Sequence, residues 1–208
     1  GKDAFILFST YGFPLEITVE MAKEKNIKVD ISGFNKEFEN HQHLSKTASA
    51  GMFKGGLADA GEKTTRYHTA THLLHQALKI VLGESVAQKG SNITAERLRF
   101  DFAYPEKMAK EQIEKAEEIV NGKIKENLPV SWQEMDLEEA KKSGAIGLFG
   151  HKYETKVKVY IIGGESSYFS KEICMGPHAN STGKLGRFKI VKEEAVSTGV
   201  RRIKAILE

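Results

Sequence analysis

The sequence has a single cysteine, Cys174, among its 208 residues. No disulfide can form within the chain, which favours a reducing compartment and leaves the thiol free for metal binding or catalysis. No stretch approaches the roughly 20 consecutive apolar residues of a transmembrane helix, and no charged-then-apolar leader opens the chain. Internal repeats and low-complexity tracts are also lacking. We therefore expect a globular protein that has no membrane partner and is located in the cytoplasm.

Neither sign of charge is in large excess. The 31 Lys and Arg against 28 Asp and Glu give a formal net charge of +3. This surplus is unevenly distributed, because residues 179–208 hold seven basic and three acidic side chains, whereas residues 1–50 hold six and seven. A basic C-terminal end favours a polyanionic partner.

Helix and strand signals divide the chain into three parts. We predict short helices over residues 1–47, a glycine- and alanine-rich linker over 48–66, and a mixture of helices and strands over 67–208. In the third part, helices are predicted at about 66–82 and 107–127, and β signals fall at 97–104, 156–164, 167–174, 187–196 and 200–207. Because these elements lack a regular βαβ rhythm, we predict an α+β fold. Its mainly antiparallel sheet packs against long helices and is preceded by the short helical segment.

Three histidines lie within eight residues of one predicted helix, in the segment YHTATHLLHQAL. On a wheel of about 100° per residue, His68, His72 and His75 share one side of the helix. The opposite side carries the apolar residues Ala70, Leu73, Leu74, Ala77, Leu78 and Val81. The imidazoles are therefore expected to point away from the core, toward a cleft or solvent. His68 and His72, one turn apart, suit two ligands of one metal ion, although surface helices often carry such a pair without metal.

A second group of candidate ligands lies in the segment CMGPHANSTG, just after a predicted strand. Cys174 and His178 are four residues apart, and Gly176 and Pro177 between them indicate a tight turn. With the histidine pair of the helix they provide three imidazole nitrogens and one thiolate sulfur, a donor set that Zn²⁺ accepts in tetrahedral geometry. The alternative is a buried, inert Cys174 and a His178 on a surface loop.

Blocks spread over nearly the whole chain, all but residues 45–66, form a specific combination. They are HTATHLL and, about a hundred residues later, SKEICMGPHANSTGKLGRFKIVKEEAVSTGVRRI, with QKGSNITAERLRFDF and GAIGLFGHKYETKVKVY between them. This combination resembles the editing domain of alanyl-tRNA synthetases and their stand-alone deacylase relatives. The opening AFILFSTYGFPLEITVEMAKEKNIKVDISGF is similar to the end of the helical tRNA-recognition domain that precedes editing. Since free-standing editing proteins lack the TYGFP segment, the resemblance implies an internal piece of a full synthetase, with the remaining domains of that parent as partners.

The resemblance implies which residues form the site. The zinc ligands of the family's editing site match His68, His72, Cys174 and His178. Thr71 and Gln88 match pocket positions that contact or position the misattached amino acid and the tRNA end. Alternatively, Thr71 only packs or caps, and Gln88 is only a polar residue of a turn.

A basic pair near the C-terminus matches another family block. Arg201 and Arg202 lie in the family's GVRRI strand, where they would meet tRNA phosphates, since arginine binds such oxygens in bidentate fashion. The alternative is a solvated edge strand. Either assignment is consistent with the basic surplus of the C-terminal end.

The implied activity is hydrolysis of the ester that joins a wrong amino acid, serine or glycine, to the 3′ adenosine of alanine tRNA. A synthetic pocket for alanine discriminates weakly against smaller glycine and against serine, so a second sieve is needed. The implied domains are the end of the tRNA-recognition domain at 1–47, a linker in place of the family's β-barrel at 48–66, and the editing domain at 67–208. Four ligands fit a structural zinc site as well as a catalytic one that loses a ligand.

The second motif leaves alternatives open. The family's second motif usually reads C-G-G-T-H, whereas this chain has Met175 and Pro177 in C-M-G-P-H. One alternative is therefore a zinc-stabilised tRNA-binding module without deacylase activity. Another is a threonyl-type editing domain, which shares the H-x3-H and C-x3-H pattern. A cysteine hydrolase using Cys174 is a further possibility, whereas HTATH lacks the glutamate of zinc proteases.

Overall fold

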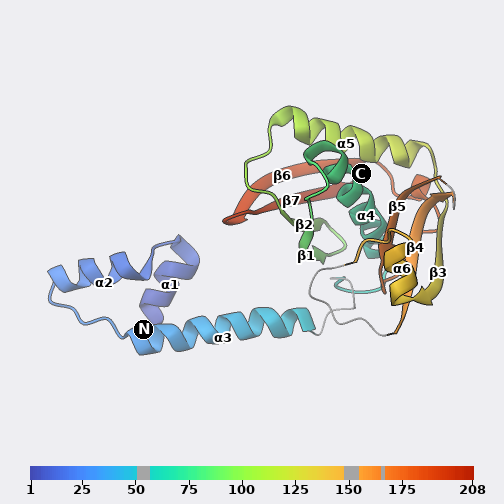
Figure 1. The fold of residues 1–208 in the computed structure, drawn as a ribbon. Coiled ribbons are helices and arrows are strands. Elements are labelled where there is room, and N and C mark those ends of the chain that lie inside the picture. The colour runs from blue at the N-terminus through green and yellow to red at the C-terminus, as the bar shows by residue number, and fades with distance from the viewer. Residues whose placement is uncertain (51–56, 148–154, 165–166) are drawn as a thin grey trace. The chain divides into compact units, whose positions relative to one another are not determined.

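The computed structural model describes residues 1–50, 57–147, 155–164 and 167–208 (Figure 1). The chain divides into two compact units, Gly1–Gly51 and Met52–Glu208. Residues 51–56 of the predicted linker and residues 148–154 of the block GAIGLFGHKYETKVKVY lie outside the described residues. In the described part, no helix combines the length and apolar character needed to cross a membrane.

The first unit consists of the helices α1 (Lys2–Tyr11), α2 (Leu15–Glu24) and α3 (Ile31–Ala50). Gly12 ends α1 in the left-handed conformation, with φ of 68°, which costs glycine little. The rings of Phe8 and Phe34 meet edge to face, with centroids 5.6 Å apart. The helical segment predicted before the α+β part is therefore confirmed.

The second unit contains two antiparallel sheets. Strands β1 (Gln88–Ile93), β2 (Leu98–Ala103), β7 (Val200–Leu207) and β6 (Phe188–Ser197) form one sheet in that order, and β3 (Val130–Asp136), β4 (Lys156–Gly164) and β5 (Ser167–Ile173) form the other. The helices are α4 (Glu62–Leu82), α5 (Lys110–Lys125), α6 (Leu137–Lys142) and a 3-10 turn at Thr182–Lys184. The predicted α+β class with antiparallel pairing is confirmed, although the strands form two sheets.

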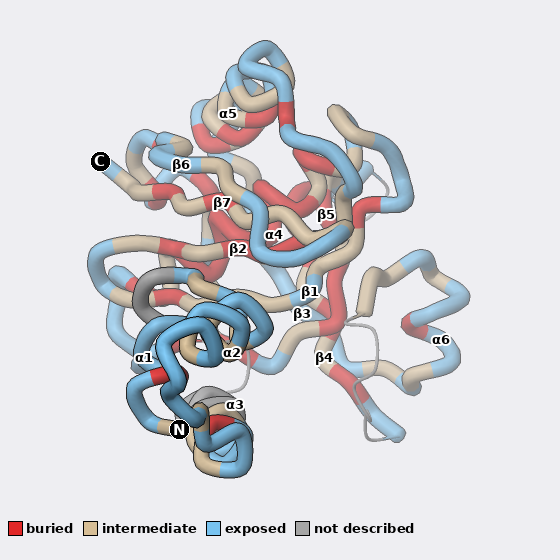
Figure 2. The backbone as a smooth tube through the Cα atoms, turned by 90° about the vertical axis from the view of Figure 1, so that its left-hand side faces the viewer, coloured by how far each residue is buried: buried red, intermediate tan, exposed pale blue. Residues whose placement is uncertain are grey.

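Helix α4 lies between the two sheets (Figure 1) and contacts β1 and β2 of one and β5 of the other. Its apolar side packs into a core with α5 and the four-stranded sheet, where Leu74, Phe100 and Val120 are fully buried. The three-stranded sheet has a second, smaller core on its other face, where Val159 packs with Ala140 of α6. Figure 2 shows buried residues gathered in the α+β unit and sparse in α1 and α2. Both sides of α4 are therefore covered.

Strand β6 forms one edge of the four-stranded sheet. Its pairing with β7 shifts register twice, between Ile190 and Lys192 and between Ala195 and Ser197. Val191, at the first shift, is 60% exposed. The outer strand is thus bent at two bulges.

Candidate metal centre

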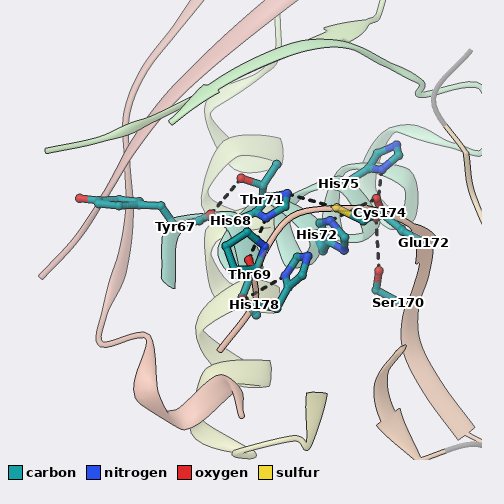
Figure 3. A network of polar contacts seen from close by, with 11 residues as sticks. Tyr67, His68, Thr69, Thr71, His72, His75, Ser170, Glu172, Cys174 and His178 are labelled. Atoms are coloured by element: carbon teal, nitrogen blue, oxygen red, sulfur yellow. Dashed lines mark hydrogen bonds and ion pairs between the residues drawn. The ribbon is translucent and has the colours of Figure 1, made fainter. Parts of the chain in front are cut away.

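Helix α4 and the turn after β5 bring the four predicted ligands together (Figure 3). One donor atom from each of His68, His72, Cys174 and His178 lies within 4.8 Å of the others. Cys174 Sγ is 3.4 Å from His68 Nε2, and the rings of His68 and His178 stack with centroids 4.2 Å apart. Two residues from one helix and two from a distant turn therefore converge on a single point.

The histidines of α4 are buried, unlike the expectation that they face a cleft or solvent. His68, His72 and His75 are 3%, 5% and 3% exposed. They do lie on the side of α4 opposite the apolar residues, as the wheel indicates, but β5 and the turn that follows it cover this side. The expectation of exposure was wrong because helical periodicity carries no information about a second sheet packing on the polar side.

Hydrogen bonds fix which nitrogen of His178 is free. The Thr69 hydroxyl donates to the carbonyl of Thr65, at 3.2 Å, and accepts from the amide of Ala179, at 2.9 Å. The hydroxyl oxygen is also 3.2 Å from His178 Nδ1. With its hydrogen given to Thr65 it accepts there, and His178 then carries its proton on Nδ1. His178 Nε2 is buried and has no hydrogen-bond partner among the described residues. Its lone pair is therefore available to a metal ion.

His68 is oriented in the same way. Its Nδ1 donates to the carbonyl of Pro177, at 3.0 Å, because a carbonyl oxygen can only accept. The lone pair of His68 then lies on Nε2, the atom next to Cys174 Sγ. Histidine ligands of metals are typically held by such a bond from the other ring nitrogen. The side chains present therefore fit a metal ion.

Burial sets the protonation states of the ligands. Burial, and next the neighbouring His72, lower the pKa of His68 to about 3, and burial holds the pKa of His178 well below its usual range. Both imidazoles are then neutral near pH 7, as metal ligation requires. Cys174 keeps some exposure, yet removal of water from its sulfur raises the pKa of the thiol to about 12. Without a cation the thiol stays protonated, which argues against a cysteine nucleophile.

Glu172 is a member of the site that sequence reasoning missed. Its buried carboxylate accepts from His75 Nδ1, at 3.1 Å, and from Ser170 Oγ, at 3.3 Å, and Oε2 lies 3.9 Å from His72 Nε2. Burial raises the pKa of Glu172, but the neighbouring His72 and His75 outweigh it, and hydrogen bonds from His75 and Ser170 add to the lowering, giving about 2. His75 is thus outside the group of four candidate ligands and holds the carboxylate beside it. The signal was alternation in SKEIC, which places residues 170, 172 and 174 on one face of a strand.

Thr71, predicted to line the pocket, lies in the same helix as two of the candidate ligands. Thr71 is buried, and its hydroxyl donates to the carbonyl of Tyr67 at 2.9 Å (Figure 3). The hydroxyl therefore keeps lone pairs with which to accept a hydrogen bond. Gln88 begins β1 in the other sheet and is half-buried.

The two arginines lie on neighbouring positions of β7, so their side chains leave opposite faces of the four-stranded sheet. Arg201 pairs with Glu193. Arg202 donates two hydrogen bonds to Asp101, at 2.7 and 2.8 Å. Each guanidinium already has a carboxylate partner, so a phosphate would have to compete with it.

Comparison with known proteins places the chain beside aminoacyl-tRNA synthetases. Residues 157–204 match the model of the threonyl and alanyl tRNA synthetase second additional domain, and residues 1–101 match that of class II (A) tRNA synthetases. The alanine–tRNA ligases of Treponema denticola and Treponema pallidum are 57% and 56% identical over 208 residues, covering 100% of this chain and 34% of each relative.

A more distant relative has a different layout. The alanine–tRNA ligase of Thermus thermophilus is 33% identical over 321 residues, covering 99% of this chain and 36% of the relative. Because that alignment is much longer than 208 residues, the Thermus protein contains stretches without counterpart here. The chain spans about a third of the length of the curated relatives that it matches.

Proposed function

Because the chain belongs to the alanine–tRNA ligase family, we propose that it is the editing part of such a ligase. It hydrolyses the ester of serine or glycine wrongly attached to the 3′ adenosine of alanine tRNA, in the cytoplasm. The observation that carries the proposal is the convergence of three imidazoles and one thiol within 4.8 Å, in a unit of the editing-associated family. Residues 1–47 are then the end of the tRNA-recognition domain, 48–66 the linker that replaces the β-barrel, and 67–208 the editing domain.

The proposed metal is zinc, held by His68 and His72 of α4 and by Cys174 and His178 of the turn. Three nitrogens and one sulfur suit Zn²⁺, which prefers four ligands of these types. When bound, the ion would supply Lewis-acid stabilisation of the ester carbonyl or a fixed point that orients the acceptor end. Cys174 and His178 keep some exposure, and a substrate would reach the centre from their side.

Preference for serine over alanine is assigned to Thr71. Its hydroxyl oxygen keeps an acceptor lone pair after donating to Tyr67, and it lies three residues from His68 on the same helix. A hydroxyl that accepts from the serine side chain favours serine over alanine, because a site built for a hydrogen bond disfavours the analogue that lacks one. Gln88, Arg201 and Arg202 are proposed to contact the tRNA, the two arginines by exchanging their carboxylate partners for phosphate.

The test is release of amino acid from charged tRNA. The purified, zinc-loaded chain is incubated with alanine tRNA charged with serine, glycine or alanine, and each free amino acid is measured over time. We expect release of serine or glycine well above the rate without protein, and slow release of alanine. No release above the uncatalysed rate would contradict the proposal.

The second candidate function is a zinc-stabilised tRNA-binding module without deacylase activity. Pro177 favours it, because proline supplies no N–H to an oxyanion. Loss of one oxyanion donor costs on the order of a hundredfold to a thousandfold in rate. The double substitution Met175→Gly with Pro177→Thr should then raise the rate on serine-charged tRNA without changing the metal content. An unchanged rate would show that this turn needs no such donor.

A further inference from the structure

In the three-stranded sheet, the face next to the candidate ligands extends across β4 to an exposed aromatic side chain on β3. In the three-stranded sheet, Tyr160 lies opposite Glu172, and Trp132 lies opposite Tyr160. Residues directly opposite each other share one face of a sheet. One row of side chains therefore runs from the buried Glu172 to Trp132 on the outer strand β3, a span of two strand spacings or about 10 Å.

The middle of this row touches the centre. The Tyr160 ring is 4.1 Å, centroid to centroid, from the ring of His178. In the next row the amide of Cys174 donates to the carbonyl of Lys158, at 3.0 Å. The Lys158 ammonium then lies 4.3 Å from the centroid of the Trp132 ring. The ammonium over the Trp132 ring thus lies one strand away from Tyr160, which contacts the candidate ligand His178.

The surroundings of Trp132 suit a nucleotide better than an apolar protein surface. Trp132 is 52% exposed, and its neighbours on this face along β3 and β4 include the charged residues Glu134 and Lys158. An apolar docking patch would require contiguous apolar side chains. An exposed ring beside a cation is instead the combination with which proteins hold single-stranded nucleic acid, the ring stacking on a base and the cation meeting a phosphate.

We propose that Trp132 and Lys158 form a platform for the single-stranded 3′ end of tRNA, with a base stacked on the indole and the ammonium near a phosphate. The inference rests on the proposed function, because it requires the aminoacyl ester to lie at the centre. The platform therefore positions the end of the substrate and does not touch the reacting ester.

The chain contains its own reporter. Trp132 is its only tryptophan, so tryptophan fluorescence reports on the platform alone. The probe is the RNA trinucleotide CCA, the sequence with which tRNA ends, added to the metal-loaded 208-residue chain. We expect saturable quenching of the fluorescence. Unchanged fluorescence at concentrations where a fluorophore-labelled CCA is bound, as judged by its anisotropy, would overturn the proposal.

Variants separate the two parts of the platform, with affinity measured by the anisotropy of labelled CCA. Trp132→Ala should weaken binding about tenfold or more, and Trp132→Phe should retain most of the affinity, because any aromatic ring can stack. Lys158→Gln should weaken binding and lower the salt dependence by about one ion. Equal affinity of Trp132→Ala and the unsubstituted chain would overturn the proposal.

Tyr168 offers a matched control on the same sheet. It is 43% exposed, and the Lys171 ammonium lies 5.5 Å from its ring centroid, so it is a second pair of exposed aromatic and lysine. Tyr168→Ala should leave CCA affinity unchanged. An equal loss with Tyr168→Ala would mean that exposed aromatics bind the trinucleotide without regard to the centre, which overturns the platform.

The two proposals fail separately. Release of serine from charged tRNA without any effect of CCA on Trp132 would leave the proposed function standing and overturn the platform. Quenching by CCA without release of serine would overturn the proposed function and support the platform as a binding site for the tRNA end.

Discussion

The helical unit and the α+β unit differ in how they bury their apolar residues. No residue of α2 is buried, and Ile17, Met21 and Ile27 of the first unit are 43%, 49% and 60% exposed. In the second unit, α4 alone contributes Leu73, Leu74, Ala77 and Leu78, all fully buried, to a core shared with α5 and the four-stranded sheet. The candidate metal centre thus rests on a core that is complete within its unit, whereas the helical unit presents apolar surface that only further packing would cover.

The largest expected effect tests the core itself. Phe100 is fully buried, and its ring centroid is 5.5 Å from that of His75. Phe100→Ala should lower the free energy of unfolding of the α+β unit by about 3–5 kcal/mol, measured by urea denaturation followed by Trp132 fluorescence. The matched change is Phe8→Ala, at a side chain 38% exposed in the first unit. It should lower the free energy of unfolding of that unit by about 1 kcal/mol or less, measured by circular dichroism of its helices. Equal losses of unfolding free energy in the two variants would show that the two units do not differ in how they bury apolar residues.

A ligand substitution should have the next largest effect. Cys174→Ser should lower zinc affinity more than a hundredfold, beyond the tenfold to hundredfold expected for a residue that only supports a ligand. The measurement is competition with a chelator, with zinc content determined after purification. His72→Ala should behave alike, and His75→Ala should still bind about one zinc. Complete loss of zinc with His75→Ala would show that the ligand set is wrong.

A smaller loss is expected at the carboxylate behind the ligands. Glu172→Gln keeps the shape of the side chain but removes the charge that faces His72 and His75, so zinc affinity should fall about tenfold to a hundredfold. The control is Glu134→Gln, an exposed carboxylate on the same sheet, which should leave the affinity unchanged. If the two variants bind zinc equally well, Glu172 serves only the packing of β5.

The smallest effect is expected from removing the helical unit. Because the four ligands and their supporting residues all lie between Thr65 and Ala179, deletion of residues 1–50 should leave the zinc stoichiometry at about one. Elemental analysis of the purified short chain makes the measurement. A short chain without zinc would show that the centre depends on the first unit.

Alternation and helical periodicity predicted most of the α+β elements. Strands β4 to β7 begin and end within one or two residues of the predicted ranges. In β4, β5 and β7, buried residues alternate with less buried ones over part of the strand. Strand β1 was not predicted, because QKGSNI contains Gly90 and no apolar alternation. It forms a strand because it pairs with β2. Helix α4 begins at Glu62, earlier than predicted, and the division into two sheets depends on contacts that no local pattern encodes.

The candidate site was likewise predicted in part. The spacing of two short motifs and a family resemblance predicted the four converging residues. The supporting bonds were not predicted, because Thr69 with Ala179 and Pro177 with His68 are pairs more than a hundred residues apart in the chain. Glu172 was within reach of sequence reasoning, two residues before Cys174 on the same face of a strand, had the alternation been extended into the motif.

The two bulges of β6 bear on how the protein behaves at high concentration. An edge strand with a regular row of free amide and carbonyl groups can template another chain, and the exposed Val191 would add to that tendency. The register shifts at residues 190–192 and 195–197 interrupt the row, and Lys192 and Glu194 place opposite charges between them. The outer edge of the four-stranded sheet is therefore protected against edge-to-edge aggregation by its own irregularity.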